Sequence, residues 1–345
     1  MLRDGRWRAF LVIPLIAAAV ALFIYHGPDW HLVHDAFTVV RWRWVIAAIG
    51  LNLLSVLARA LSWDTTIKQS LEPPWPRFPL VFSAFSVGLF ANAVLPGRVG
   101  ELARVAVLRR RLPGRRGVTA TLIGSVFAHR IFDVFPATVL VIWVLFTAKI
   151  PGWALTSIVV VLAIGLVLFV AALLLARRAH RDALEGLGPA RQLLARARLG
   201  LAVMRSPVAA GTAAAFQSVG WACQLLAVWA TMFAFHIHTA LSTAGLVLVL
   251  INVATLFPLW PGNFGLVQIA IAFPLVNYGV PYARGFAFGI GLQAIEASVG
   301  VGVGLVFLAR EGLSYAMLKT IEEPVESTEK VLEQEPGRAR SRVSG

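Results

Sequence analysis

The sequence is poor in charge and in cysteine, and each shortage excludes a class of protein. Charged residues make up only 14% of the 345 residues, fewer than a soluble domain of this size carries. The single cysteine, Cys223, lies within an apolar run, so the chain cannot build an internal disulfide framework. A Gly-x-x-x-x-Gly-Lys-Ser/Thr loop for nucleotide phosphates is also missing from the sequence. Apolar residues are abundant, at 58%, and mean hydropathy is strongly positive, which indicates a protein whose solvent is a lipid bilayer.

Apolar runs of membrane-spanning length recur along the chain. A hydrocarbon core of about 30 Å needs about 20 apolar residues per helix, whereas the short alternating segments of a membrane β-barrel are not found in the sequence. We therefore predict an all-α polytopic membrane protein with about seven to nine apolar segments. The candidate segments are residues 9–25, 42–63, 78–95, 118–148, 153–176, 208–235, 239–259, 264–280 and 282–309.

The predicted membrane domain covers residues 1–310. Its first apolar run follows three arginines and is interpreted as a retained helix, with a cleaved signal peptide as the alternative. Residues 177–206 alternate arginines with leucines, which favours an amphipathic helix on the membrane surface. Residues 311–345 are rich in acidic residues, serine and proline, so we predict a disordered cytoplasmic tail.

The basic residues predict both a partner and an orientation. The net charge of +14 comes from arginines placed between apolar segments, which favours anionic lipid headgroups over nucleic acid as the partner. If the first helix runs outward, 25 of the 31 lysines and arginines fall in loops on one side, and cytoplasmic loops collect these residues. We expect a multi-pass protein of the plasma membrane with both termini in the cytoplasm. This orientation requires the chain to enter at residue 78 and return by Arg109 without crossing.

Two apolar segments are interrupted by proline and glycine. Residues 92–111 and 252–268 each contain Pro-Gly-x-x-Gly, and the first interruption leaves too few residues for a second crossing. A re-entrant or broken helix is tolerated in a bilayer only where its unwound backbone is buried or lines a wet cavity. One such segment in each half of the chain indicates a possible inverted repeat with a binding site at mid-membrane depth, where helix N-termini attract an anion. Glycines that only allow close helix packing are the alternative.

Ionisable residues inside the apolar segments need a partner or a role, because a charge at mid-membrane is costly. Arg130 and Asp133 share a helix face, as a self-neutralising pair or as a substrate contact. His129 beside them is interpreted as a packing residue that could also titrate. Glu296 is a candidate to bind a proton or to pair across helices with Arg98 or Arg130. Arg59 is explained by snorkelling to the membrane surface.

Several motifs occur in a fixed order over nearly the whole chain. They are Asn92, the run Leu-Pro-Gly-Arg-Val-Gly-Glu-Leu-Ala-Arg at 95–104, the pair Arg130 and Asp133, and Pro261-Gly262-x-x-Gly265 followed by Gly279-Val280. Together they resemble the flippase-like, lysylphosphatidylglycerol synthase transmembrane region family. The resemblance implies an inner-membrane protein that moves or handles lipids with headgroups, such as aminoacylated phosphatidylglycerol or polyprenyl-phosphate-linked sugars.

The sequence departs from that family's pattern at several positions. The family usually has an acidic residue where His129 stands, and a glycine and a glutamate where Asn263 and Gln268 stand. These departures put the details of substrate and coupling in doubt. The larger synthases also carry a soluble aminoacyl-transfer domain for which this chain has no room, so we expect that it does not make the lipid itself.

We therefore expect a membrane lipid translocase or lipid-binding transporter for an anionic or polyprenyl-phosphate-linked headgroup, with no catalytic site, cofactor or metal. Two alternatives stay open: a membrane transferase acting on a lipid-linked sugar or phospholipid, and an accessory subunit of an envelope-synthesis complex. In the second, the basic loops would contact a glycosyltransferase or lipid-modifying enzyme. The candidate substrate-binding residues are Asn92, Gly97, Arg98, Gly100, Glu101, Arg104, Arg130, Asp133, Gly262, Asn263, Gly265, Gln268 and Glu296.

Overall fold

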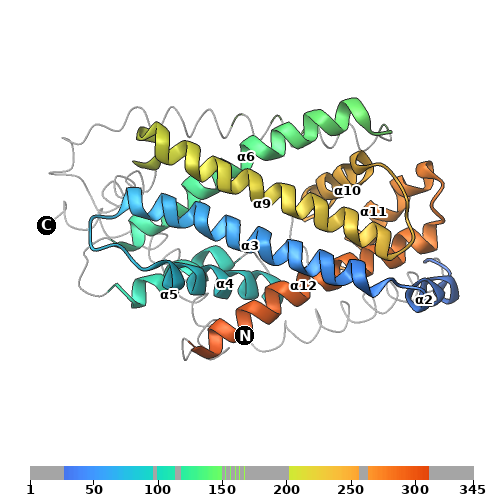
Figure 1. The fold of residues 1–345 in the computed structure, drawn as a ribbon, viewed down its shortest axis with the longest axis horizontal. Helices are drawn as coiled ribbons and strands as arrows, with labels where there is room; N and C mark the ends of the chain where they lie inside the picture. The colour runs from blue at the N-terminus through green and yellow to red at the C-terminus, as the bar shows by residue number, and fades with distance from the viewer. Residues whose placement is uncertain are drawn as a thin grey trace, which may run out of the picture.

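The computed structural model is a bundle of α-helices (Figure 1). It describes residues 27–95, 99–112, 118–149, 202–255 and 263–310, together with isolated positions between 152 and 167. The helices are α2 (Trp30–Thr38), α3 (Trp42–Ser70), α4 (Phe78–Val94), α5 (Gly100–Arg110), α6 (Val118–Thr147), α9 (Pro207–Ala234), α10 (Leu241–Ala254), α11 (Leu266–Leu275) and α12 (Tyr282–Arg310), with short 3-10 turns η1 (Ala202–Arg205) and η3 (Val276–Tyr278).

Four of the described helices, α3, α6, α9 and α12, are long and apolar enough to cross a membrane. Each has 28 to 30 residues, and an α-helix of that length spans about 42–45 Å. The first residue of each helix lies within one residue of the start of the corresponding predicted apolar run. The prediction of an all-α polytopic membrane protein is confirmed for the described residues, and the apolar runs located these helices because the bilayer thickness sets the number of apolar residues that a span needs.

The two interrupted segments form short helical hairpins. The first is α4 followed by α5, with 17 and 11 residues, and the second is α10 followed by α11, with 14 and 10 residues. The two helices of each hairpin pack against one another. Figure 1 shows α5 turned back toward the end of the bundle where α3 ends, as expected for a re-entrant hairpin.

The helices fall into two repeats with the same order of lengths. The series α3 to α6 is long, short, short, long, and the series α9 to α12 follows the same order. Gly100 and Gly265, at the starts of α5 and α11, are 165 residues apart, and the same separation joins Ser55 of α3 to its hydrogen-bond partner Gly220 of α9. Helix contacts are repeated as well, since α4 packs on α12 as α10 packs on α6.

The two repeats are inverted. Ser55 Oγ donates to the carbonyl of Gly220 at 2.7 Å. Ser62, about two turns further along α3, donates to the carbonyl of Ala213, which is earlier in α9, at 2.9 Å. Helices α3 and α9 are therefore antiparallel. The chain thus shows the inverted repeat that its two Pro-Gly motifs indicated.

Helix α12 packs against both hairpins at opposite ends, through glycines. A Cβ atom at Gly304 would clash with Phe90 of α4 and lie 2.9 Å from the carbonyl oxygen of Ser86. A Cβ atom at Gly289, nearer the start of α12, would lie 3.2 Å from the Cα of Gln268 in α11. Small residues let membrane helices approach closely, so these glycines fix where each hairpin sits.

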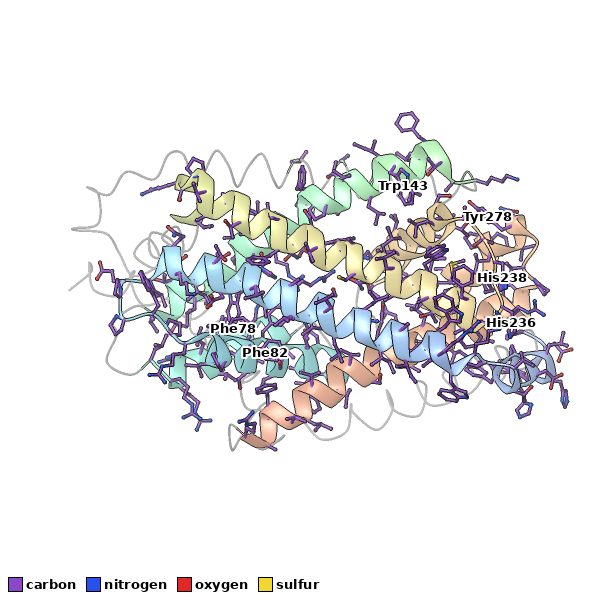
Figure 2. The ribbon with its side chains drawn as sticks, in the orientation of Figure 1. Phe78, Phe82, Trp143, His236, His238 and Tyr278 are labelled. Atoms are coloured by element: carbon purple, nitrogen blue, oxygen red, sulfur yellow. The ribbon has the colours of Figure 1, made fainter. Side chains whose placement is uncertain are left out.

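Apart from Arg59, Arg104 and Arg130, the described basic residues lie at the two ends of the bundle. One end holds Lys68, Arg77, Arg109, Arg110, Arg111, Arg205 and Arg310, and the other holds Arg41, Arg43, Lys149 and Arg284. At the second end, the backbone N–H of Lys149 donates to the Tyr278 hydroxyl at 2.6 Å. Figure 2 shows His236, His238 and Tyr278 together at this end. Where the loops assigned to one side by their charge are described, they lie at one end of the bundle.

Some predicted features lie outside the described residues. These are the first apolar run at 9–25, almost all of the segments 153–176 and 177–206, and the tail at 311–345.

Candidate functional site

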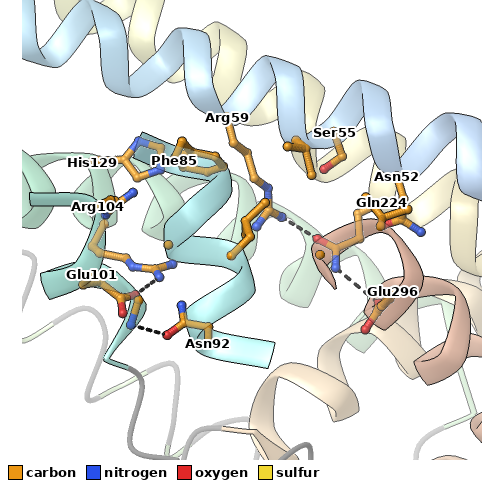
Figure 3. A pocket seen from close by; sticks show the side chains of 17 residues that line it. Asn52, Ser55, Arg59, Phe85, Asn92, Glu101, Arg104, His129, Gln224 and Glu296 are labelled. Atoms are coloured by element: carbon orange, nitrogen blue, oxygen red, sulfur yellow. Dashed lines mark hydrogen bonds and ion pairs between the residues drawn. The ribbon is translucent and has the colours of Figure 1, made fainter. Parts of the chain in front are cut away.

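A polar pocket lies inside the bundle, beside the first hairpin (Figure 3). Its volume is about 200 Å³, well above the roughly 10–15 Å³ that one water molecule needs on the same measure, so it can hold more than a single water. Its walls come from α3, α4, α5, α6, α9 and α12. The polar and charged residues that line it are Asn52, Ser55, Arg59, Asn92, Glu101, Arg104, His129, Arg130, Gln224 and Glu296.

The start of α5 forms one edge of the pocket. The Asn92 side chain, from the last turn of α4, accepts a hydrogen bond from the backbone N–H of Gly100 at 2.8 Å. A Cβ atom at Gly100 would collide with the carbonyl of Gly88 and with Asn92, so only glycine permits this contact. The hairpin is thereby closed tightly enough to bring Glu101 and Arg104 to the pocket.

Arg104 is a buried cation without a carboxylate partner among the described residues. Its exposed fraction is 4%, and its Nε and Nη2 atoms are buried with no hydrogen-bond acceptor in the described part of the chain. The guanidinium instead lies over two aromatic rings, 4.7 Å from the ring centre of Trp63 and 5.6 Å from that of Phe85. These rings stabilise the positive charge and leave its N–H groups available to an anion.

Arg130 of α6 joins the pocket to a buried network. Its guanidinium pairs with Glu101 of α5 and with Asp133 one turn along α6, the latter at 3.3 Å. Asp133 also accepts hydrogen bonds from Gln217 and, at 2.9 Å, from Trp221 Nε1. Both carboxylate oxygens of Asp133 accept hydrogen bonds from protein side chains. The Oε2 atom of Glu101, by contrast, is buried without a partner among the described residues.

The opposite wall is built from α3, α9 and α12. Arg59 donates to the side-chain oxygen of Gln224, whose amide nitrogen lies 3.5 Å from a carboxylate oxygen of Glu296 (Figure 3). The Nε atom of Arg59 and the Nδ2 atom of Asn52 are buried without partners among the described residues. Interpreting Arg59 as a snorkelling residue is wrong, because its guanidinium lines this pocket. Glu296 reaches Gln224, not Arg130.

The described residues of the second hairpin do not line this pocket. Gln268 is fully buried, accepts from the Gly265 backbone N–H at 2.6 Å and donates to Gln293 at 2.6 Å. Asn263 is also buried and donates to the carbonyl of Ala254 at 2.8 Å. These three candidates, Asn263, Gly265 and Gln268, lie in a neutral, internally bonded turn.

The predicted site residues are thus divided. Six of them line the pocket: Asn92, Gly100, Glu101, Arg104, Arg130 and Glu296. Asp133 lies behind the pocket on Arg130, and Gly97, Arg98 and Gly262 fall outside the described residues.

Sequence reasoning missed Asn52, Ser55 and Gln224, and misjudged Arg59. Arg59 and Gln224 are separated by 165 residues, the spacing that also relates the two Pro-Gly-x-x-Gly motifs. They are equivalent positions of the two repeats, and residues near an inverted-repeat axis meet their own counterparts. Extending the motif spacing to the long helices would have found this pair.

Comparison with known families gives one match. The family described as Lysylphosphatidylglycerol synthase TM region matches residues 9–304. No match was found among curated proteins or among solved structures. The matched range contains every described helix, apart from the last turns of α12, and all the residues of the pocket. The chain therefore belongs to the lysylphosphatidylglycerol synthase transmembrane region family, a family of multi-pass membrane proteins connected with membrane lipids.

Proposed function

We propose that the protein binds and translocates a membrane lipid with an anionic headgroup, either a phospholipid or a polyprenyl phosphate. The observation that carries this proposal is Arg104, a buried cation whose Nε and Nη2 atoms have no acceptor among the described residues. An unpaired charge inside a membrane protein is costly and is retained where it has a function. A phosphate oxygen would supply the acceptor that the described residues do not.

The surroundings of Arg104 favour a phosphate over a neutral group. Arg59 and Arg130 line the same pocket, and α5 begins beside it. Guanidinium groups bind phosphates through paired hydrogen bonds, and a helix N-terminus adds a partial positive charge. Acyl chains would stay in the surrounding lipid while the headgroup occupies the pocket.

The inverted repeat favours transport over a fixed lipid site. Repeats of opposite topology give a membrane protein two related conformations that face opposite sides. We propose that the bundle end rich in arginine, where α3 and α12 end, faces the cytoplasm of the plasma membrane, because cytoplasmic loops collect basic residues.

Transport can be tested in liposomes that contain the purified protein and labelled phosphatidylglycerol. We expect Arg104→Gln to lower both lipid transport and lipid retention by about tenfold or more, the effect of losing a charged hydrogen bond. Arg109→Gln is the matched control, because Arg109 lies on the same helix and is exposed. Equal transport by both variants would refute the assigned site.

The same samples test the transferase alternative. Mass spectrometry of the lipids after incubation should return phosphatidylglycerol with its headgroup mass unchanged. A covalently altered headgroup that depends on the protein would favour an enzyme.

A further inference from the structure

Two carboxylates near Arg59, those of Asp133 and Glu296, differ in how many hydrogen bonds they accept. Asp133 and Glu296 both act electrostatically on Arg59, from α6 and α12, which are equivalent helices of the two repeats. Asp133 accepts from Arg130, Gln217 and Trp221. Three donors hold it as an anion.

Glu296 has much weaker support for a negative charge. Its carboxylate has one hydrogen-bond contact among the described residues, with the Gln224 amide at 3.5 Å, and it makes no ion pair there. Gln224 also links Glu296 to a cation, because its side-chain oxygen accepts a hydrogen bond from Arg59. Arg59 itself makes no ion pair with Glu296 among the described residues. Glu296 is therefore the carboxylate that can accept a proton without breaking an ion pair.

The charges around the pocket balance only when Glu296 is ionised. The described part places three guanidinium groups there, Arg59, Arg104 and Arg130, against three carboxylates, Glu101, Asp133 and Glu296. His129 is counted as neutral, because its ring is buried and makes no ion pair with a carboxylate among the described residues. A phosphodiester headgroup adds one negative charge, and a net charge within a membrane is unfavourable.

Apart from the three arginines and two other carboxylates already counted, the described residues that face Glu296 from the neighbouring helices carry no formal charge. The uncharged residues that line the pocket are Asn52, Ser55 and Val56 of α3, Phe85, Gly88, Leu89 and Asn92 of α4, and Gln224 of α9. The ionisable residues there are Arg59 of α3, Glu101 and Arg104 of α5, and His129 and Arg130 of α6. Helix α11 packs against α12 through Gln268 and Ala272, and the ionisable residues of α2 are Asp35, His31 and His34, on a helix at the other end of the bundle.

We propose that Glu296 takes up one proton from solvent when an anionic headgroup enters the pocket, so that lipid and proton bind together. The carboxylate and the proton form the neutral acid, and no other bond changes. This inference rests on the proposed function, since it assumes that the anion binds beside Arg104. It makes a proton gradient a source of energy for moving the lipid.

Proton uptake can be measured directly with the detergent-purified protein in weakly buffered solution. At a pH where Glu296 is ionised before lipid is added, a pH indicator should report about one proton taken up for each phosphatidylglycerol molecule bound. Phosphatidylcholine, whose headgroup has no net charge, should give no uptake. Wild-type protein that binds phosphatidylglycerol without taking up a proton would overturn the inference.

The variant Glu296→Gln assigns the proton to this residue. Because it resembles the protonated state, it should bind phosphatidylglycerol without proton uptake, and its Kd should stay constant as pH rises. The wild-type Kd should increase by up to about tenfold per pH unit in the range where Glu296 is ionised. Asp35→Asn, an exposed carboxylate on α2, is the matched control and should behave as wild type.

The two proposals fail in different ways. Native mass spectrometry counts bound lipid without reference to protons, so loss of Arg104-dependent binding there would refute the proposed function and this inference with it. Normal Arg104-dependent binding, with proton uptake that persists in Glu296→Gln, would refute the proton site alone.

Discussion

The first hairpin carries Glu101 and Arg104 at the positions where the second hairpin, 165 residues later, carries Leu266 and Ile269. Each hairpin consists of two short helices, and each packs against α12 through a glycine of that helix. Only the first has charged side chains facing a pocket. The inverted repeat therefore provides two hairpins of similar structure, of which only the first carries charged side chains.

The second hairpin uses its polar residues on itself. Gln268 bonds the backbone at Gly265 and the side chain of Gln293, whereas Arg104 in the first hairpin has atoms left without acceptors among the described residues. A satisfied polar group stabilises the fold, and an unsatisfied one is costly unless a ligand completes it. From this comparison we propose a structural role for the second hairpin and lipid binding for the first.

The largest expected effect is the loss of the first hairpin in Gly100→Val. The new side chain would collide with the Gly88 carbonyl and with Asn92, and overpacking against backbone costs about 3 kcal/mol or more. Thermal unfolding in detergent should show a much lower Tm or no folded protein. A Tm equal to that of wild type would mean that α4 and α5 do not pack this closely.

A smaller effect is expected in the second hairpin from Gln268→Leu. The Gly265 N–H would lose its acceptor and Gln293 one of its contacts, which costs about 1–3 kcal/mol per unsatisfied group. Tm should fall, while phosphatidylglycerol retained per folded molecule stays at the wild-type level. Lost retention in a well-folded variant would instead show that the second hairpin binds lipid.

The contact of α12 with each hairpin can be compared by two alanine substitutions. Gly304→Ala should lower stability by about 1–3 kcal/mol, because its Cβ would meet Phe90 and the Ser86 carbonyl. Gly289→Ala should cost less, since its nearest contact is 3.2 Å. Gly302→Ala is the control, with no atom within 4 Å of the added carbon. An equal Tm for all three would remove the argument that these glycines position the hairpins.

The smallest effect, and opposite in sign, is expected from Arg104→Met. Replacing an unpaired buried charge by an apolar side chain of similar length should leave the free energy of unfolding unchanged or raise it by about 1 kcal/mol, although lipid retention falls. Thermal unfolding without added lipid would measure this. A strongly reduced Tm would show that Arg104 is a structural residue.

Most of the fold could be predicted from the sequence. The long apolar runs gave the bounds of α6, α9 and α12 and the start of α3 to within one residue, whereas α3 continues seven residues beyond its predicted end. The agreement follows because the thickness of the bilayer sets the number of apolar residues in each span. The two Pro-Gly motifs likewise predicted the hairpins and their repeat, since proline and glycine end membrane helices in a recognisable way.

The sequence predicted the pocket residues from α5 and α6 but not those from α3 and α9. Glu101, Arg104 and Arg130 stood out because charge inside an apolar segment is rare. Arg59 was placed at the membrane surface, and Gln224 was not considered, because a single helix does not reveal which helix lies against it. Their contact depends on the antiparallel packing of α3 on α9.

The sequence by itself determined that this chain is a membrane protein, where most of its long helices begin and end, and that two further apolar segments are interrupted. These properties follow from the solvent, which acts on each segment separately. Only the tertiary structure decided that one hairpin, not both, lines the charged pocket, and that Glu296 shares it with Arg59 and Arg104. That outcome depends on which helix faces touch, and segments far apart in the chain settle it together.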